Sequence, residues 1–361
     1  MRMIVASAAA AALLISGCSG SISRATPPAS TPAPSPASPA SPASSAPASA
    51  SSPHALEAEY ERVIQEVLPS IVQINTKVGL GSGIVYDSAG HIVTNAHVVG
   101  EATEMEVTLA TGGTARPARL VASFPAGDLA VIKVSDPNGL APARFGDSAK
   151  LRVGQIVLAM GNPLGLSGSV TNGIVSALGR TVSEPQDGGA PGATIANAIQ
   201  TSAAINPGNS GGALVDLSGQ VIGIPTLAAT DPQLGGGAAP GIGFAIPSNT
   251  ATDIAAQIVK DGKVTNSRRA ALGIAGRTVI GPEGTPVGVG VVSVTRGGGA
   301  ALAGIAAGDV IVSVNGTDTP TMSALSEILA SQKPGGQAKV EVVKPDGSTG
   351  TVTVTLGELD A

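Results

Sequence analysis

Asn206-Pro207-Gly208-Asn209-Ser210-Gly211-Gly212 sets one serine among glycines, and the apolar run Ala213-Leu214-Val215 follows it. Glycine has no Cβ, so it reaches backbone angles that other residues avoid and lets a ligand approach the chain closely. A nucleophilic serine needs both properties, because its hydroxyl must be exposed on a tight turn and nearby N–H groups must face the oxygen that gains charge. The stretch therefore predicts that Ser210 is a catalytic nucleophile.

The order of the possible catalytic residues along the chain limits the choice of fold. The chain has three histidines: His54, His91 and His97. All precede Ser210, whereas an α/β-hydrolase, whose Gly-x-Ser-x-Gly elbow also fits this stretch, needs a histidine after its serine. The subtilisin order needs an aspartate before the histidine, and Asp87, the one candidate, lies in a sequence typical of a hairpin turn. The order histidine, aspartate, serine remains, with Asp128 in the middle, and this is the chymotrypsin order.

Several motifs, in one order, resemble those of the HtrA/Deg proteases. They are residues 81–85, 94–99, 128–134, 161–165, 203–212 and 241–247. The resemblance extends from about residue 67 to the C-terminus. It implies an all-β chymotrypsin-like double β-barrel, with the active site in the cleft between the barrels, followed by a small α+β PDZ domain. Many short β-rich runs separated by Gly, Pro and Asn or Asp agree with this fold class.

The resemblance also implies the catalytic roles. His97 takes the proton of the Ser210 hydroxyl as that oxygen attacks a peptide carbonyl, then passes the proton to the leaving amine. Asp128 holds the His97 ring in the required tautomer. Residues Gly208, Asn209 and Ser210 form the oxyanion hole, with the N–H groups of Gly208 and Ser210 as its donors.

Plainer interpretations exist for each of these residues. His91 fits a packed histidine of a strand or turn, and Ser210 could be a simple turn serine. Asp128 could be an acid that caps a strand, with Asp136 and Asp147 as its rivals. The sequence context of His97, Thr-Asn-Ala-His, favours the catalytic interpretation.

The resemblance extends to substrate specificity. The expected substrate-binding residues are Ala204, Ile205, Thr226, Leu227 and Ala228. Ala204 stands six residues before the nucleophile, where trypsin-like pockets carry an acid, and with Ile205 it predicts cleavage after small or medium aliphatic residues. The strand 226–228 should pair with an extended substrate backbone. Pro225 replaces the usual asparagine and removes an N–H from this strand, and Ser202 replaces the usual acid.

Two loops rich in Gly, Pro and Asp, residues 183–193 and 230–241, flank the nucleophile along the chain. Glycine-rich segments lose much conformational entropy when they become ordered. Two interpretations stay open: either a ligand orders the loops and thereby completes the oxyanion hole, or the loops are passive parts of the surface.

The C-terminal part resembles a PDZ domain on residues 271–274, 304–311 and 314–316 and on a helix at 322–331. A helix at 248–259, capped by Ser248 or Asn249, precedes it. The resemblance implies that the N–H groups of Ala271, Leu272 and Gly273 bind a peptide carboxylate, while the peptide adds as a strand beside Ile274. Met322, Leu325 and Leu329 would shape the side-chain pocket. Ordinary strand packing is the alternative for Leu272 and Ile274.

The N-terminus is typical of an exported lipoprotein. An apolar run at residues 4–15 is shorter than the about 20 residues that span a bilayer, so it predicts a secretory signal. Leu14-Ile15-Ser16-Gly17-Cys18 resembles a bacterial lipobox, and we expect lipid attachment at Cys18, the single cysteine; the alternative is a stray thiol. The Ser-, Pro- and Ala-rich residues 19–54 cannot bury enough apolar surface to fold, which predicts a disordered tether. The alternative is a glycosylated or merely tolerated low-complexity segment.

An amphipathic helix should follow the tether and end at Pro69, because apolar residues recur there at helical spacing. In HtrA proteins the N-terminal segment helps to hold three subunits together, so a homotrimer is possible. That contact usually uses aromatic residues, and Tyr60 is the one available here.

The expected organisation is a lipoprotein signal peptide (1–18), a tether (19–54), a trypsin-like protease domain (55–259), a linker (260–269) and a PDZ domain (270–361). The 361 residues suffice for two domains. The net charge of −5, without a large basic block, argues against a nucleic-acid partner.

The predicted function is ATP-independent endoproteolysis of misfolded or unfolded proteins in the bacterial cell envelope, on the extracytoplasmic face of the membrane. The PDZ domain would bind C-terminal peptides. The sequence carries no Walker-type loop, so no nucleotide is expected. No metal or other cofactor is expected either. One alternative is a chaperone-like or scaffold protein with little protease activity. Another is an esterase, which the residue order and the PDZ domain disfavour.

Overall fold

The computed structural model describes residues 53–360 except 78, 163–167, 184–191, 207 and 232–236. The predicted signal peptide, the lipidation site Cys18 and nearly all of the predicted tether lie outside the described residues, as do parts of the loops 183–193 and 230–241. Within the described ranges, no helix is both long enough and apolar enough to span a bilayer.

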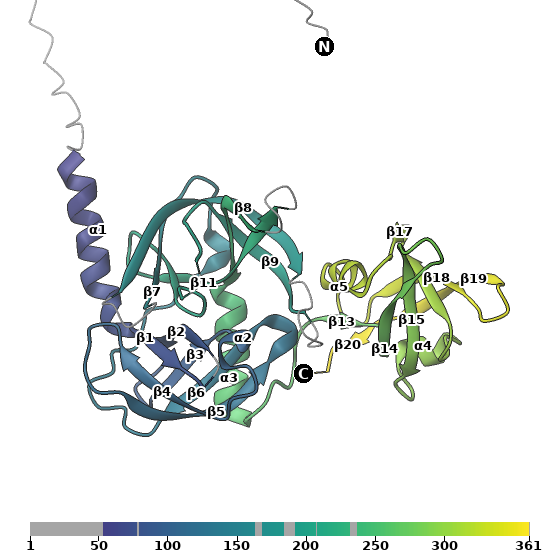
Figure 1. The fold of residues 1–361 in the computed structure, drawn as a ribbon, viewed down its shortest axis with the longest axis horizontal. Helices are drawn as coiled ribbons and strands as arrows, with labels where there is room; N and C mark the ends of the chain where they lie inside the picture. The colour runs from purple at the N-terminus through teal and green to yellow at the C-terminus, as the bar shows by residue number, and fades with distance from the viewer. Residues whose placement is uncertain are drawn as a thin grey trace, which may run out of the picture. The chain divides into compact units, whose positions relative to one another are not determined.

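The first half of the predicted protease domain forms a closed antiparallel barrel of six strands (Figure 1). The strands are β1 (Ile71–Asn75), β2 (Leu80–Val85), β3 (His91–Thr94), β4 (Glu104–Leu109), β5 (Arg116–Phe124) and β6 (Leu129–Val134), and they close in the order β1-β2-β3-β6-β5-β4. Branched aliphatic side chains such as Val72, Ile74, Ile92 and Ile132 fill the interior and are fully buried. Such residues suit strands because they pack well on a pleated surface.

The second barrel repeats this plan. Its strands are β7 (Ile156–Gly161), β8 (Ser169–Ser183), β9 (Thr194–Thr201), β10 (Ala213–Asp216), β11 (Val221–Asp231) and β12 (Gly237–Pro247), closed in the order β10-β11-β12-β9-β8-β7. Val157, Ile199, Leu214 and Ile222 belong to its buried interior. The expected chymotrypsin-like double barrel is therefore confirmed.

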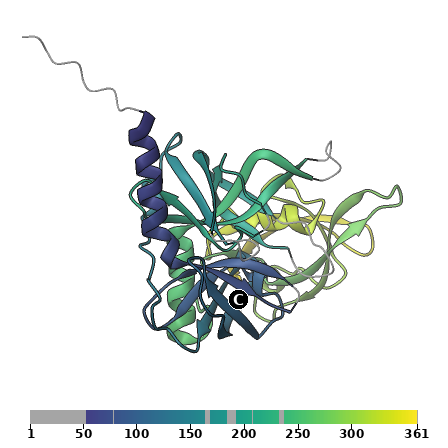
Figure 2. The same cartoon turned by 60° about the vertical axis from the view of Figure 1, so that its left-hand side comes forward.

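Two helices pack against the barrels. One end of α1 (Pro53–Val67) lies on the barrels while the other projects away from them (Figures 1 and 2). Val63 and Val67 of this helix are buried, and Arg62 donates a hydrogen bond of 2.7 Å to the Leu217 carbonyl. The single turn η1 (Leu68–Ser70) follows, with Pro69 in it, so the helix ends where the proline predicted. The second helix, α3 (Ser248–Asp261), follows the last barrel strand and buries Ile254 and Ile258.

The predicted cap of α3 is wrong in its detail. Neither Ser248 nor Asn249 caps the helix with its side chain, and Pro247 is the N-cap residue. The Ser248 hydroxyl instead donates to the Gly146 carbonyl at 2.7 Å, and the Asn249 amide donates to Asp147 at 2.8 Å. The two side chains expected to cap the helix therefore bind partners about 100 residues earlier in the chain.

The C-terminal part has its own hydrophobic core. Its strands are β13 (Ala270–Ala271), β14 (Ile274–Ile280), β15 (Pro286–Val294), β16 (Val310–Val314), β17 (Thr317–Asp318), β18 (Gln337–Val343), β19 (Thr349–Thr355) and β20 (Gly357–Glu358). The main sheet has the order β14-β15-β16-β18-β19, and β13 pairs with β20. The helices are α4 (Gly299–Leu302) and α5 (Met322–Ala330). Thr321 caps α5, because its hydroxyl accepts from the Ala324 N–H at 3.1 Å.

Candidate active site

His97 lies on the one-turn helix α2 (Ala96–Val99), directly after β3. The buried side chains of Val98 and Val99 pack in the core of the first barrel and so hold this turn in place. Asn95, which precedes the helix, is fully buried, and its amide donates to the Asp128 carbonyl at 2.9 Å. The backbone positions of His97 and Asp128 are therefore tied together, although 31 residues separate them along the chain.

The Asp128 carboxylate is buried and accepts several hydrogen bonds. Asp128 follows the short helix η2 (Pro125–Gly127), with a left-handed φ of 53°. Its oxygens accept from the His97 backbone N–H at 3.0 Å and from His97 Nδ1, which lies 3.0 Å from both of them. The Thr226 hydroxyl donates to the same carboxylate. Because a carboxylate only accepts, Nδ1 carries the ring proton, and Nε2 is the basic nitrogen of the neutral ring.

Ser210 lies in the turn before β10, and its hydroxyl donates to the Thr226 carbonyl at 3.1 Å. Thr226 thus binds one catalytic candidate from each barrel. The Thr226 hydroxyl donates to Asp128 of the first barrel, and the Thr226 carbonyl accepts from Ser210 of the second. The structure brings His97, Asp128 and Ser210 into one hydrogen-bonded assembly, in which Thr226 binds both Asp128 and Ser210. Sequence reasoning expected Thr226 only in the substrate strand and missed this link.

A bulge in β11 aims Thr226 at the site. The pairing of β11 with β12 shifts in register between Pro225 and Leu227, which leaves Thr226 outside the regular ladder. Bulges of this kind redirect a side chain and tolerate a proline that lacks an N–H. Although Pro225 has no N–H, its carbonyl still accepts a hydrogen bond, from the Gly211 N–H at 3.0 Å. The replacement of asparagine by Pro225 is therefore accommodated where the strand is already irregular.

The segment expected to form the oxyanion hole is a tight turn. The Asn209 N–H donates to the Asn206 carbonyl at 3.1 Å, and Gly208 has a φ of +107°. A positive φ at the third residue of a turn favours glycine, because a residue with a Cβ is strained in that conformation. The Asn209 side chain binds inside the same loop, to the Asn206 N–H at 3.1 Å and the Ala204 carbonyl at 3.0 Å. The backbone N–H and the side-chain amide of Asn209 therefore both bind within the loop. The N–H groups of Gly208 and Ser210 remain the candidate donors of the oxyanion hole.

The expected specificity residues lie on the chain that enters this turn. Ile205 is buried against Gly243 of β12, whereas the neighbouring Ala204 is exposed. The Ala204 carbonyl accepts from the Thr171 hydroxyl at 2.8 Å, which fixes the backbone at this point. Ser202, the other departure from the family pattern, bonds to β8 through its hydroxyl, which accepts from the Ile174 N–H at 3.0 Å. The side chains of Leu227 and Ala228 lie outside the described residues.

The expected peptide site of the C-terminal domain coincides with a cavity of about 240 Å³. Residues of the loop 271–274 and of α5 line it together: Ala271, Leu272, Gly273, Ile274, Met322, Leu325 and Leu329. Leu272 is buried in the domain core, so its side chain packs as the plainer interpretation expects. The Leu272 carbonyl accepts from the Ala300 N–H and the Gly273 carbonyl from the Thr295 N–H, each at 2.9 Å.

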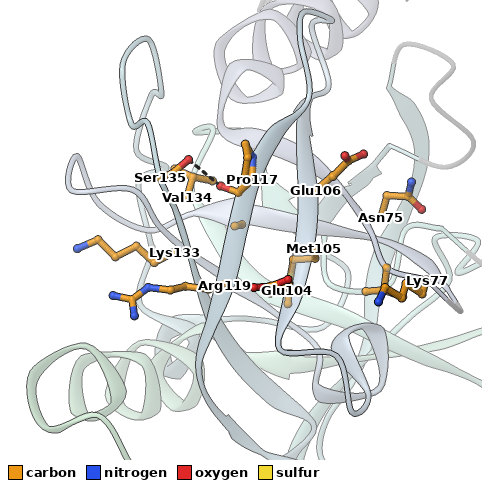
Figure 3. Close-up of a pocket in the computed structure, with 12 residues that line it drawn as sticks. Asn75, Lys77, Glu104, Met105, Glu106, Pro117, Arg119, Lys133, Val134 and Ser135 are labelled. Carbon is orange, nitrogen blue, oxygen red and sulfur yellow. Dashed lines mark hydrogen bonds between the residues drawn. The ribbon is translucent and has the colours of Figure 1, made fainter.

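A larger hollow of about 820 Å³ lies on the first barrel, over β1, β4, β5 and β6. Figure 3 shows the charged side chains of Arg119, Lys133 and Glu106 spread around it. None of the three catalytic candidates lines this hollow. Its size alone therefore does not make it the active site, because reaction chemistry depends on convergent functional groups.

Comparison with known proteins agrees with the geometry. The family described as "Trypsin-like peptidase domain" matches residues 81–224, and the family described as "PDZ domain" matches residues 290–344. Serine protease PepD of Mycobacterium tuberculosis is 40% identical over 319 residues, which cover 83% of this chain and 66% of PepD. Periplasmic serine endoprotease DegP of Escherichia coli is 40% identical over 287 residues, which cover 77% of this chain and 57% of DegP.

A solved structure of the HtrA-type protease AlgW with tripeptide matches with a TM-score of 0.55 and 34% sequence identity. The match covers 84% of this chain and 98% of that one. The chain thus spans nearly the whole of a solved relative but 57–66% of the two longer curated relatives. With two closed barrels, a hydrogen-bonded His97–Asp128 pair and these matches in hand, we conclude that the chain belongs to the HtrA family of trypsin-like serine proteases.

Proposed function

We propose that this chain is an ATP-independent serine endopeptidase that cleaves misfolded or unfolded proteins outside the cytoplasmic membrane. The observation that carries the proposal is the pairing of His97 Nδ1 with the buried Asp128 carboxylate at 3.0 Å. A buried acid that orients a part-exposed imidazole is the arrangement that general-base activation of a serine requires. The side chain of His97 is 39% exposed and that of Asp128 only 2% exposed. The base is therefore accessible to a substrate, while its carboxylate partner is shielded from solvent.

The mechanism assigns one role to each residue. His97 removes the proton of the Ser210 hydroxyl, and the oxygen attacks the peptide carbonyl. The hydroxyl must first leave the Thr226 carbonyl, to which it donates in the resting chain. Asp128 stabilises the imidazolium that forms, and the N–H groups of Gly208 and Ser210 bind the oxyanion. His97 then protonates the leaving amine as the C–N bond breaks, which leaves an ester on Ser210. His97 next takes a proton from water as the water oxygen attacks this ester, and it returns the proton to the Ser210 oxygen as the acid product leaves.

The substrate class follows from the substrate strand and the pocket. An unfolded segment can add as a strand along residues 226–228, because only an extended backbone offers the necessary N–H and C=O groups. Ala204 and Ile205 bring no charge to the pocket, so we propose cleavage after small or medium aliphatic residues. The cavity beside the loop 271–274 would take a C-terminal peptide, which is the usual occupant of a site built from a backbone N–H loop and a strand edge.

The proposed location is the extracytoplasmic face of the bacterial membrane, with Cys18 as the lipid-bearing residue. The signal-like N-terminus supports it, as does the likeness to DegP, which is named a periplasmic protein. The domain ranges given above and a homotrimer belong to the same proposal. Membrane fractionation of a Cys18→Ala variant tests the anchor, and size-exclusion chromatography with light scattering tests the assembly.

Degradation of casein, an unfolded protein, by the wild type and by Ser210→Ala tests the activity. We expect degradation by the wild type without ATP and none by the variant, together with fluorophosphonate labelling that Ser210→Ala abolishes. Cleavage sites in a peptide library should follow Val, Ala or Ile. A wild type that binds casein but neither degrades it nor takes the label would instead indicate a chaperone-like or scaffold protein.

A further inference from the structure

Ser82, on β2 of the first barrel, makes an unusual set of contacts for a buried serine. Its side chain is fully buried. Its hydroxyl donates to the Gly208 carbonyl at 2.5 Å and accepts from the Asn162 N–H at 2.8 Å. Its backbone N–H donates to the Ser210 carbonyl at 3.0 Å. One residue of the first barrel thus binds two carbonyls of the turn at residues 206–210, here called the nucleophile turn, which belongs to the second barrel.

Those two carbonyls belong to the residues whose N–H groups are the proposed oxyanion donors. The peptide between Gly208 and Asn209 is held at both edges, because Ser82 binds its carbonyl and the Asn206 carbonyl binds its N–H at 3.1 Å. The only torsions between this held peptide and the Gly208 N–H are those of Gly208 itself. A glycine rotates about them with little steric resistance, so the hydrogen bonds around it must fix the direction of its N–H.

The surroundings of Ser82 also hold its hydroxyl in one orientation. The Thr94 hydroxyl donates to the Ser82 carbonyl at 2.6 Å, and Thr94 lies three residues before the catalytic candidate His97. The Asn162 N–H occupies an acceptor site of the Ser82 oxygen, so the single proton of that oxygen is directed to Gly208. The hydroxyl therefore acts as an oriented donor between the barrels.

We propose that Ser82 is a positioning residue for the oxyanion hole: its hydroxyl holds the turn in the conformation in which the Gly208 N–H can bind the oxyanion. The inference rests on the proposed endopeptidase activity. Loss of the hydroxyl leaves the carbonyl of Gly208 without this donor and allows the turn to rotate. Binding of the ground-state substrate changes little, whereas stabilisation of the tetrahedral intermediate weakens, because only the latter depends on the direction of that N–H.

The test compares Ser82→Ala with the wild type on a short peptide that carries valine before the scissile bond. Rates are divided by the active sites counted from fluorophosphonate labelling carried to completion, so that unfolded molecules do not count. We expect kcat per site to fall about 10- to 100-fold, since a displaced donor costs less than a deleted one, while KM stays within about twofold. The affinity of a peptide boronate, which forms a tetrahedral adduct, should fall in parallel with kcat/KM.

Ser248→Ala is the matched control. Ser248 is also fully buried, and its hydroxyl also donates to a glycine carbonyl, that of Gly146 at 2.7 Å, but outside the nucleophile turn. We expect this variant to lose thermal stability to a similar degree and to keep kcat per site. Should Ser82→Ala not accumulate as folded protein, Ser82→Cys carries the same test, because it is close in size and its thiol is a weak donor.

Equal kcat per site in Ser82→Ala and the wild type, or an equal loss in the Ser248→Ala control, overturns the inference. A rise in KM without a fall in kcat does so as well, because the hydroxyl would then serve substrate binding. A wild type that fails to cleave the peptide or to take the label would refute the endopeptidase proposal itself, which is a separate result.

Discussion

At the scale of single residues, Thr226 links Asp128 of the first barrel to Ser210 of the second, a role that the local sequence does not indicate. It is buried, donates to the Asp128 carboxylate and accepts from the Ser210 hydroxyl at 3.1 Å. A hydrogen bond to a charged group contributes more than one between neutral groups, about 1.5–3 kcal/mol. The hydroxyl of Thr226 should therefore matter for the orientation of Asp128, and through it for His97.

Thr226→Val removes this hydroxyl and nearly keeps the shape of the side chain. We expect kcat/KM on a short peptide to fall roughly 10- to 100-fold, which corresponds to the loss of one charge-assisted hydrogen bond. Thr252→Val is the control, because the Thr252 hydroxyl donates to the Ser248 carbonyl at 2.9 Å within α3. A Thr226→Val enzyme with the activity of the control would show that Asp128 is oriented sufficiently without the threonine.

At the scale of elements, the turn between β2 and β3 is organised by one carboxylate. Asp87 accepts from the Ala89 N–H at 2.9 Å, the His91 N–H at 3.1 Å and His91 Nδ1 at 2.7 Å. Burial opposes the charged form of Asp87, but the hydrogen bonds from His91 and Ala89 outweigh it and lower the pKa of the carboxyl. The prediction of a hairpin turn at Asp87 and of a structural His91 agrees with this arrangement.

The lowered pKa of Asp87 makes its contribution to stability pH-dependent. A carboxyl whose pKa is lower in the folded chain stabilises the fold fully above its unfolded pKa of about 4, and loses that effect as the pH falls through the folded pKa. Asp87→Asn should therefore lower the free energy of unfolding by about 1 kcal/mol at pH 7, and the difference should shrink in acid. Urea unfolding of both proteins at several pH values measures this. A difference that grows as the pH falls would contradict the assignment.

The close packing of β8 against the segment that leads into the nucleophile turn requires a glycine at position 173. A Cβ at Gly173 would overlap the backbone nitrogen and Cα of Ala203, which cannot move aside as a flexible side chain would. Gly173→Ala should cost about 1–3 kcal/mol of stability and lower the melting temperature. Gly350→Ala, in β19, is the control, since a Cβ there meets nothing within 4 Å. Equal melting temperatures for the two variants would contradict the predicted overlap.

At the scale of the whole molecule, the described hydrophobic cores divide between the two domains. The buried clusters of the barrels contain residues between Val63 and Val264, whereas the C-terminal cluster contains residues between Ala270 and Leu356. No described core residue is shared between the two groups. Because burial of apolar surface is the main favourable term in folding, each part has its own source of stability.

A shortened chain of residues 53–269 should therefore fold without the C-terminal domain. We expect one cooperative thermal transition and a kcat/KM on short peptides within about threefold of the full chain, whereas degradation of casein should fall if the PDZ domain delivers substrate. Circular dichroism and the two activity assays measure these effects. A shortened chain that is unfolded would show that the barrels need the C-terminal domain for stability.

The sequence by itself determined the fold class and the identity of the catalytic candidates. The candidates follow from residue order and from the glycines around Ser210, and the fold class follows from the resemblance of several motifs to those of the HtrA/Deg proteases. Only the tertiary structure decided which partner each of the buried hydroxyls binds. Thr226 binds Asp128, 98 positions away in the sequence, and Ser82 binds Gly208, 126 positions away. The Ser248 hydroxyl binds the Gly146 carbonyl and does not cap its own helix. A hydrogen bond acts over about 3 Å and in one direction, so its partner is set by strand register and by the bulge in β11, which no local pattern encodes.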